Sequence, residues 1–142
     1  MRVDGEYETV DSDFWFKGKT VVVFSLPGAF TPTCSTQQLP GYEDRYQEFR
    51  DEGIDEIYCI SVNDSFVMNA WAKDLGIENV KLLPDGNGMF TKRMEQIVDK
   101  QNSGMGTRSW RYAMILKDSE IIKQWVEEGK TDNANIDPYS NT

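Results

Sequence analysis

The sequence predicts an α/β protein with a mixed central sheet flanked by helices. Two apolar stretches rich in β-branched residues, 20–26 and 54–64, are separated by a stretch with helical spacing, the pattern of two parallel strands joined by a helix. A third apolar region, 110–128, is interrupted by the polar residues KDSE and indicates an antiparallel hairpin. The parallel pair and the antiparallel hairpin together predict a mixed sheet.

The first half of the chain contains the clearest elements. The stretch 20–26, TVVVFSL, lacks polar alternation, which is typical of a strand buried on both faces. In the next stretch, 34–53, apolar residues recur at helical spacing and Gly53 supplies a C-terminal stop. These apolar residues are Leu39, Tyr42, Tyr46 and Phe49. The second strand is predicted within 54–64.

The second half adds a helix, a short strand, a further helix and the hairpin. The stretch 65–76 is amphipathic and ends at Gly76. Its apolar face comprises Phe66, Met68, Ala70, Trp71 and Leu75. The stretch 80–90 predicts a short strand ending in a turn, because its Asp-Gly and Asn-Gly pairs tolerate positive φ, and 89–98 predicts a helix. This element order, with right-handed crossovers, is that of a thioredoxin-like core.

Length and composition predict a single domain spanning 1–142. Its 142 residues, 39% of them apolar, are enough to bury one core without a metal or a disulfide. The stretch 129–142 is polar, Asn-rich and without helical periodicity, so it is expected to be a flexible tail.

Charge and cysteine content exclude several classes of function. A net charge of −9 repels nucleic acid and anionic membranes, and no apolar run is long enough to span a bilayer. The N-terminus lacks the pattern of a secretory signal, so a cytoplasmic protein is expected. With two cysteines and no histidine, we expect neither a disulfide framework nor a metal site, and no cofactor is predicted.

The stretch PGAFTPTCS follows the first predicted strand directly. Its proline and glycine turn the chain, and the hydroxyl of Thr31 or Thr33 is available to cap the helix that follows. Cys34 is therefore expected in the first helical turn, where unpaired backbone N–H groups and the helix dipole favour a thiolate. Because the chain has no histidine, an arginine is the expected source of further positive charge.

The two cysteines have different surroundings. A free cysteine is more commonly a small buried hydrophobe than a nucleophile, and Cys59 fits that description because it lies in mid-strand among apolar residues. Cys34 lies among threonines and prolines, where packing gives little reason for a cysteine. Cys34 is therefore the candidate nucleophile.

The stretch PGAFTPTCS resembles the Pro-x-x-x-Thr-x-x-Cys signature of the peroxiredoxins, with Pro27, Thr31 and Cys34 at its three fixed positions. It is most similar to the type-five or atypical subfamily, which includes glutathione- and glutaredoxin-dependent enzymes and members fused to a glutaredoxin. Further blocks match in order, so that the resemblance covers residues 19–127: SVNDSFVMNAW, LLPDGNGMFTKRM and GMGTRSWRYAMIL. Because members of this subfamily carry a longer N-terminal hairpin and a further C-terminal helix, this chain is expected to be a shortened form or part of a longer polypeptide.

The resemblance also implies a role for each site residue. Cys34 attacks the peroxide and becomes a sulfenic acid, while Thr31 forms hydrogen bonds with the sulfur and the peroxide. Pro27 shields the sulfur from water, and Arg111 stabilises the negative charge. Arg108 ranks second to Arg111, because extended residues an odd distance apart point to opposite faces and cannot both reach one sulfur.

The function implied by the resemblance is a thiol-dependent peroxidase of the one-cysteine type, acting on hydrogen peroxide and alkyl hydroperoxides. An external thiol, either glutathione, a glutaredoxin or a thioredoxin, would reduce the sulfenic acid, because Cys59 could approach it only by local unfolding. A homodimer with PGAFT near the contact is also implied. The alternative is a non-enzymatic thiol redox sensor on the same fold.

Two other classes of cysteine protein fit the sequence less well. A thiol-disulfide oxidoreductase of the thioredoxin kind would have a second cysteine at position 31, where this chain has a threonine. A cysteine hydrolase would need a histidine as its base, and the chain has none.

Overall fold

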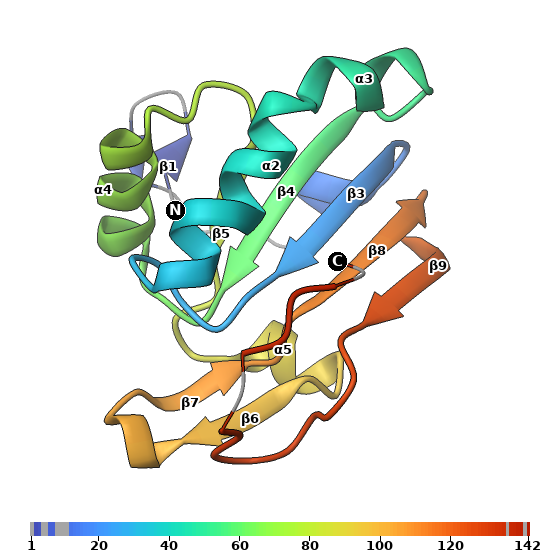
Figure 1. The fold of residues 1–142 in the computed structure, drawn as a ribbon. Helices are drawn as coiled ribbons and strands as arrows, with labels where there is room; N and C mark the ends of the chain where they lie inside the picture. The colour runs from blue at the N-terminus through green and yellow to red at the C-terminus, as the bar shows by residue number, and fades with distance from the viewer. Residues whose placement is uncertain (1, 4–5, 8–11, 136, 141) are drawn as a thin grey trace.

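The computed structural model describes residues 2–3, 6–7, 12–135, 137–140 and 142. Its centre is a five-stranded sheet in the order β5-β4-β3-β8-β9, in which β3, β4 and β5 are parallel and β8 is antiparallel to both of its neighbours (Figure 1). The strands are β3 (Thr20–Ser25), β4 (Glu56–Ser61), β5 (Lys81–Pro84), β8 (Tyr112–Lys117) and β9 (Glu120–Val126). The predicted mixed sheet is confirmed.

Helices cover both faces of this sheet. Successive side chains of a strand point to opposite faces, so each central strand contributes to two apolar clusters. The face that includes Val22 and Phe24 packs against α2, α3 and α4, and the face that includes Val21 and Val23 packs against α1 and α5. The helices are α1 (Ser12–Phe16), α2 (Leu39–Asp44), α3 (Tyr46–Asp51), α4 (Ser65–Leu75) and α5 (Met89–Arg93). None of the helices described in this structure is long and apolar enough to cross a membrane.

The helical segment predicted within 34–53 forms, but it is divided. It begins with a π-helix, η1 (Cys34–Gln38), in which the backbone N–H of Leu39 donates five residues back along the chain. Pro40 explains this wide turn, because it has no N–H to donate and its ring crowds the carbonyl four residues earlier. A second break lies at Arg45, between α2 and α3, where φ is −103°.

The prediction of one helix over 89–98 is wrong in its second half. Glu95 takes a positive φ of 59°, which ends the helical stretch, and the chain then enters β6 (Ile97–Lys100). Through the short 3-10 helix η2 (Gln101–Ser103), β6 leads to its antiparallel partner β7 (Gly106–Ser109). A second small hairpin pairs β1 (Arg2–Val3) with β2 (Glu6–Tyr7). Neither hairpin was predicted, because the apolar residues of such short strands do not form a recognisable pattern.

The predicted helix at 65–76 is α4, although its apolar face is narrower than expected. Met68 and Trp71 are fully buried against the sheet, whereas Phe66 is 69% exposed and Ala70 is also exposed. Gly76 ends the helix in the left-handed conformation, as predicted.

The predicted hairpin at 110–128 forms between β8 and β9. Asp118 and Ser119 make its turn, and both take positive φ, 49° and 68°. A two-residue turn of this kind matches the right-handed twist of the strands that it joins.

Candidate active site

Cys34 lies in the first turns of the helical segment that follows β3. The connecting turn is compact, because Pro27 and Gly28 are buried and the N–H of Thr31 donates to the carbonyl of Gly28 at 3.4 Å. Helical structure starts at Pro32, and the side chain of Cys34 is fully buried. The cysteine therefore lies at the carboxyl end of a central strand and near the amino end of a helix, as the sequence predicts.

A guanidinium reaches this sulfur from the neighbouring strand. Arg111 directly precedes β8, and its Nη1 donates to Sγ of Cys34 at 3.5 Å. The same nitrogen donates to Oε1 of Gln38, which is one helical turn beyond the cysteine. Arg111 is 1% exposed, and burial of this degree strengthens electrostatic contacts. The structure thus brings Cys34 and Arg111 into direct contact.

The C-terminal segment (residues 137–140 and 142) holds Arg111 from its other side. Nη2 pairs with Oδ1 of Asp137 at 2.5 Å, Nε donates to the carbonyl of Pro138 at 3.0 Å, and the guanidinium lies 5.7 Å from the ring centre of Tyr139. Burial opposes the charged form of Arg111, but its electrostatic contacts and hydrogen bonds with Cys34 and Asp137 outweigh this effect and raise the pKa of the guanidinium. Arg111 is therefore cationic at neutral pH.

These contacts come from the stretch expected to be a flexible tail. The described residues of 129–142 form neither helix nor strand, but the hydroxyl of Tyr42 donates to the carbonyl of Thr142 at 2.5 Å. The flexibility of this stretch stays a prediction. Its contacts with Arg111 were missed, because a segment without periodicity carries no signal of where it docks.

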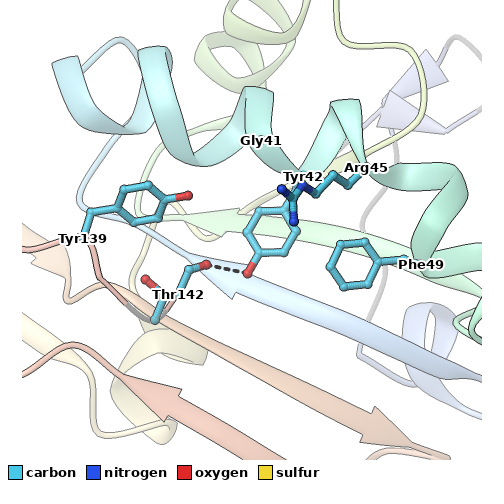
Figure 2. A pocket seen from close by; sticks show the side chains of 6 residues that line it. All are labelled: Gly41, Tyr42, Arg45, Phe49, Tyr139 and Thr142. Carbon is cyan, nitrogen blue, oxygen red and sulfur yellow. Dashed lines mark hydrogen bonds between the residues drawn. The ribbon is translucent and has the colours of Figure 1, made fainter.

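A pocket of about 390 Å³ lies between the C-terminal segment and helices α2 and α3 (Figure 2). Its lining residues are Gly41, Tyr42, Arg45, Phe49, Tyr139 and Thr142. Cys34 is not among these described residues, and Tyr139 connects the pocket to the site because its ring also faces Arg111. The pocket is therefore adjacent to the support of the arginine, not to the sulfur.

Thr31 and Pro27 lie in the turn before the cysteine. The hydroxyl of Thr31 donates to the carbonyl of Gly28 at 2.6 Å, and its own carbonyl accepts from the N–H of Ser35 at 3.0 Å. The expected helix cap is not made, because the hydroxyl of Thr31 is directed back into the turn and that of Thr33 forms no capping bond. Pro27 is buried next to this turn.

Arg108, the second-ranked arginine, contacts the turn and not the sulfur. Its Nε donates to the carbonyl of Met105 at 2.9 Å, and its Nη1 donates to the carbonyl of Pro27 at 3.4 Å. A Cβ on Gly28 would lie 2.6 Å from this Nη1, so the glycine allows the guanidinium to approach the backbone. Arg108 therefore braces the turn from outside.

Gln38 is a site residue that the sequence reasoning missed. Its side chain is fully buried, accepts from Arg111 and donates through Nε2 to the carbonyl of Ser25 at 3.5 Å. A signal was available, because Gln38 follows Cys34 by four residues and so shares its face of the helix. The buried amide of Gln38 therefore connects Arg111 with the end of β3 through hydrogen bonds.

Cys59 lies in the same apolar cluster as Cys34. It occupies the middle of β4, paired with Phe24 on one side and Leu82 on the other. Burial, together with the nearby Cys34, raises the pKa of the Cys59 thiol well above its usual value, and Arg111 opposes this only in part. Cys59 is therefore held as a neutral thiol.

The fold and the sequence are similar to those of known proteins. The Redoxin family model matches residues 2–139. A peroxiredoxin of Sinorhizobium fredii is 58% identical over 94% of this chain and 71% of its own length. The crystal structure of the Plasmodium falciparum antioxidant protein, a 1-Cys peroxiredoxin, is similar with a TM-score of 0.90 and 42% identity, over 92% of this chain and 77% of that one. Reduced Prx3 of Vibrio vulnificus in complex with hydrogen peroxide is similar with a TM-score of 0.79 and 42% identity, over 85% and 76% of the two chains.

Proposed function

Because this chain belongs to the Redoxin family as a peroxiredoxin, and is therefore a thiol peroxidase, we propose that Cys34 is the sulfur that attacks the peroxide. The observation that carries this assignment is the contact between Nη1 of Arg111 and Sγ of Cys34 at 3.5 Å. A buried guanidinium stabilises the thiolate, which is the nucleophilic form of cysteine. Cys59 has no such donor at its sulfur within the described structure and is held neutral by burial.

The reaction forms one bond and breaks another. The Cys34 thiolate attacks one peroxide oxygen, the O–O bond breaks with both electrons going to the other oxygen, and the sulfur becomes a sulfenic acid. The departing hydroxide or alkoxide takes a proton from solvent and leaves as water or alcohol. Negative charge thus moves from sulfur to the departing oxygen, and Arg111, held on both sides, stabilises it along this path.

Thr31 and Pro27 complete the proposed site. The hydroxyl proton of Thr31 is used in the bond to Gly28, so the lone pairs of its oxygen remain to accept a hydrogen bond from the O–H of the peroxide. Pro27, buried in the same turn, excludes water from the sulfur. The similar Prx3 of Vibrio vulnificus, solved with hydrogen peroxide, supports hydrogen peroxide as a substrate. Alkyl hydroperoxides are proposed as further substrates from the family resemblance.

We further propose a one-cysteine cycle with an external reductant. Cys59 would have to leave a central strand to approach Cys34, so an outside thiol is the simpler reductant. Glutathione, a glutaredoxin or a thioredoxin is proposed as this thiol from the subfamily resemblance. The cytoplasm is proposed as the location, because it supplies such thiols.

A homodimer is proposed with the turn around Phe30 at its contact. Phe30 is 53% exposed in a backbone conformation with φ of 64°, so an apolar ring projects from the turn that carries the site. Burial of such a ring against a second copy would remove it from water. Sedimentation of the wild type and of Phe30→Asp tests this proposal.

The assignment of Cys34 is tested by mass spectrometry after one equivalent of hydrogen peroxide. Cys59→Ser should gain the mass of one oxygen, and Cys34→Ser should not; the reverse pattern would overturn the assignment. Turnover is then measured with glutathione, glutaredoxin or thioredoxin supplied separately. Consumption of many equivalents with one of them identifies the reductant, whereas a stall after one equivalent with all three would favour the redox sensor.

A further inference from the structure

Glu127 is a buried carboxylate at the end of β9 that the proposed reaction does not use. It is 2% exposed, and its backbone N–H donates to the carbonyl of Arg111 at 3.2 Å. Since Tyr112 pairs with Val126 in the β8–β9 ladder, Arg111 and Glu127 form the next pair outward. Residues opposite one another on antiparallel strands project to the same face, so the carboxylate and the guanidinium lie on one side of the sheet.

The carboxylate of Glu127 is bonded to the end of the C-terminal segment. Oε1 accepts from the N–H of Ser140 at 2.7 Å and from the hydroxyl of Thr142 at 2.8 Å, and Oε2 accepts from the hydroxyl of Ser140 at 2.8 Å. Hydrogen bonds between buried groups are strengthened by their low-dielectric surroundings. Glu127 therefore fixes the position of Ser140 and Thr142.

The same segment carries the groups that hold Arg111. Asp137 and Pro138 lie two to three residues before Ser140, and both accept from the guanidinium. The described part of this segment has no helix or strand, so side-chain contacts set its course. Figure 2 shows one of these contacts, the bond from Tyr42 to Thr142 at 2.5 Å. A path of contacts thus runs from Glu127 through the segment to Arg111.

We propose that Glu127 is a positioning residue for the peroxidase reaction: it anchors the C-terminal segment, and the anchored segment aims Arg111 at the sulfur of Cys34. Glu127 itself touches neither peroxide nor sulfur. The inference rests on the proposed roles of Cys34 and Arg111. It predicts that a change at a carboxylate outside the reacting atoms slows the oxidation of Cys34.

The test is the second-order rate constant for oxidation of Cys34 by hydrogen peroxide, measured by stopped-flow fluorescence without a reductant. Glu127→Gln keeps the shape of the side chain but replaces one of its two acceptor oxygens by an NH2 group, so at least one of the three hydrogen bonds is lost or reversed. Oxidation should then slow at least tenfold. Glu128→Gln makes the same change at the exposed neighbour and should stay within twofold of the wild type. A rate within twofold of the wild type for Glu127→Gln overturns the proposal.

Repeating the measurement in the Arg111→Ala variant separates a positioning role of Glu127 from a general structural effect. If Glu127 acts through Arg111, then Glu127→Gln should slow oxidation less than twofold when Arg111→Ala is already present. Equal slowing in both backgrounds overturns the proposal. An unchanged oxidation rate for Arg111→Ala alone would contradict the proposed function of Arg111. If Arg111→Ala slows oxidation but Glu127→Gln does not, only the proposed role of Glu127 is contradicted.

If circular dichroism shows that Glu127→Gln does not fold, Ser140→Ala is the milder variant to measure instead. Ser140→Ala removes one of the three hydrogen bonds and alters a surface residue. Oxidation should then slow two- to fivefold, again only while Arg111 is present. A wild-type rate for this variant, with Glu127→Gln unfolded, counts against the proposal.

Discussion

Cys34 and Cys59 are both fully buried in the same apolar cluster, but their polar surroundings differ. Cys34 lies where a helical segment begins and accepts a hydrogen bond from Arg111. Cys59 lies in mid-strand, and burial raises the pKa of its thiol. The comparison shows that two equally buried thiols can have different electrostatic surroundings. We expect the deciding feature to be whether a buried cation is directed at the sulfur.

The largest expected effect separates the two cysteines directly. Cys34→Ser should lower the rate of peroxide consumption more than about a thousandfold, because a serine hydroxyl is a poor substitute for the thiolate nucleophile. Cys59→Ser should retain at least half of the wild-type rate. The measurement is steady-state peroxide consumption with an excess of thiol. Comparable losses in both variants would show that the two sulfurs act together.

The next effect concerns the cation that distinguishes the two sites. Arg111→Ala should slow the oxidation of Cys34 by about a hundred- to a thousandfold, equivalent to about 3–4 kcal/mol, the usual cost of removing a preorganised donor. Arg108→Ala is the matched control and should cost less than about fivefold, because Arg108 bonds to backbone carbonyls of the turn and not to the sulfur. Single-turnover stopped-flow measurements give both rates. Equal losses would contradict the ranking of the two arginines.

A smaller effect is expected from the amide beside Arg111. Gln38→Leu places an apolar side chain of similar size in the same space but removes the acceptor for Nη1 of Arg111. The guanidinium therefore loses one of its hydrogen-bond partners. The oxidation rate should fall about tenfold, which corresponds to about 1.4 kcal/mol, within the range for losing one hydrogen bond to a charged group. Gln37→Leu, at the exposed neighbour, should leave the rate unchanged. A tenfold loss there would instead indicate a general disturbance of the helix.

The smallest expected effect is on stability and tests the neutral state of Cys59. Its folded-state pKa is raised, so above the ordinary thiol pKa of about 8.5 the unfolded chain loses a proton that the folded protein keeps. The free energy of unfolding should therefore fall as pH rises from 8 to 9.5, by about 1 kcal/mol more in the wild type than in Cys59→Ala. Urea unfolding at the two pH values measures the difference. Equal losses would show that Cys59 ionises as readily in the folded protein as in the unfolded chain.

Elements with strong periodicity were predictable from the sequence. β3 and β4 lack polar alternation because helices cover both faces of the sheet, and α4 is bounded by Asp64, whose side chain accepts from the N–H of Val67, and by a left-handed glycine. The placement of Cys34 followed from a turn after a buried strand. The assignment of Arg111 came from the family resemblance, and the odd separation from Arg108 agrees with only one of the two reaching the sulfur.

The parts that escaped prediction depend on contacts between distant segments. Asp137 and Pro138 belong to a stretch without repeating pattern, so only their bonds to a buried guanidinium reveal their place. The same holds for Glu127, whose burial depends on the return of the chain end to β9. Secondary-structure propensity depends on residues that are close in sequence, whereas these hydrogen-bonded partners lie far apart in sequence.

The wide turn at η1 makes the site sensitive to the length of the chain. A π-helical turn contains one residue more than an α-helical turn, and here the extra residue falls between Cys34 and Leu39. Deleting one residue from this interval would shift Cys34 by one position relative to Leu39 and would rotate the preceding turn by about 100° around the helix axis. The contacts of α2 with the sheet would survive, while the sulfur would face away from its cation. We therefore expect an insertion or deletion of a single residue in this interval to be sufficient to separate Cys34 from the guanidinium of Arg111.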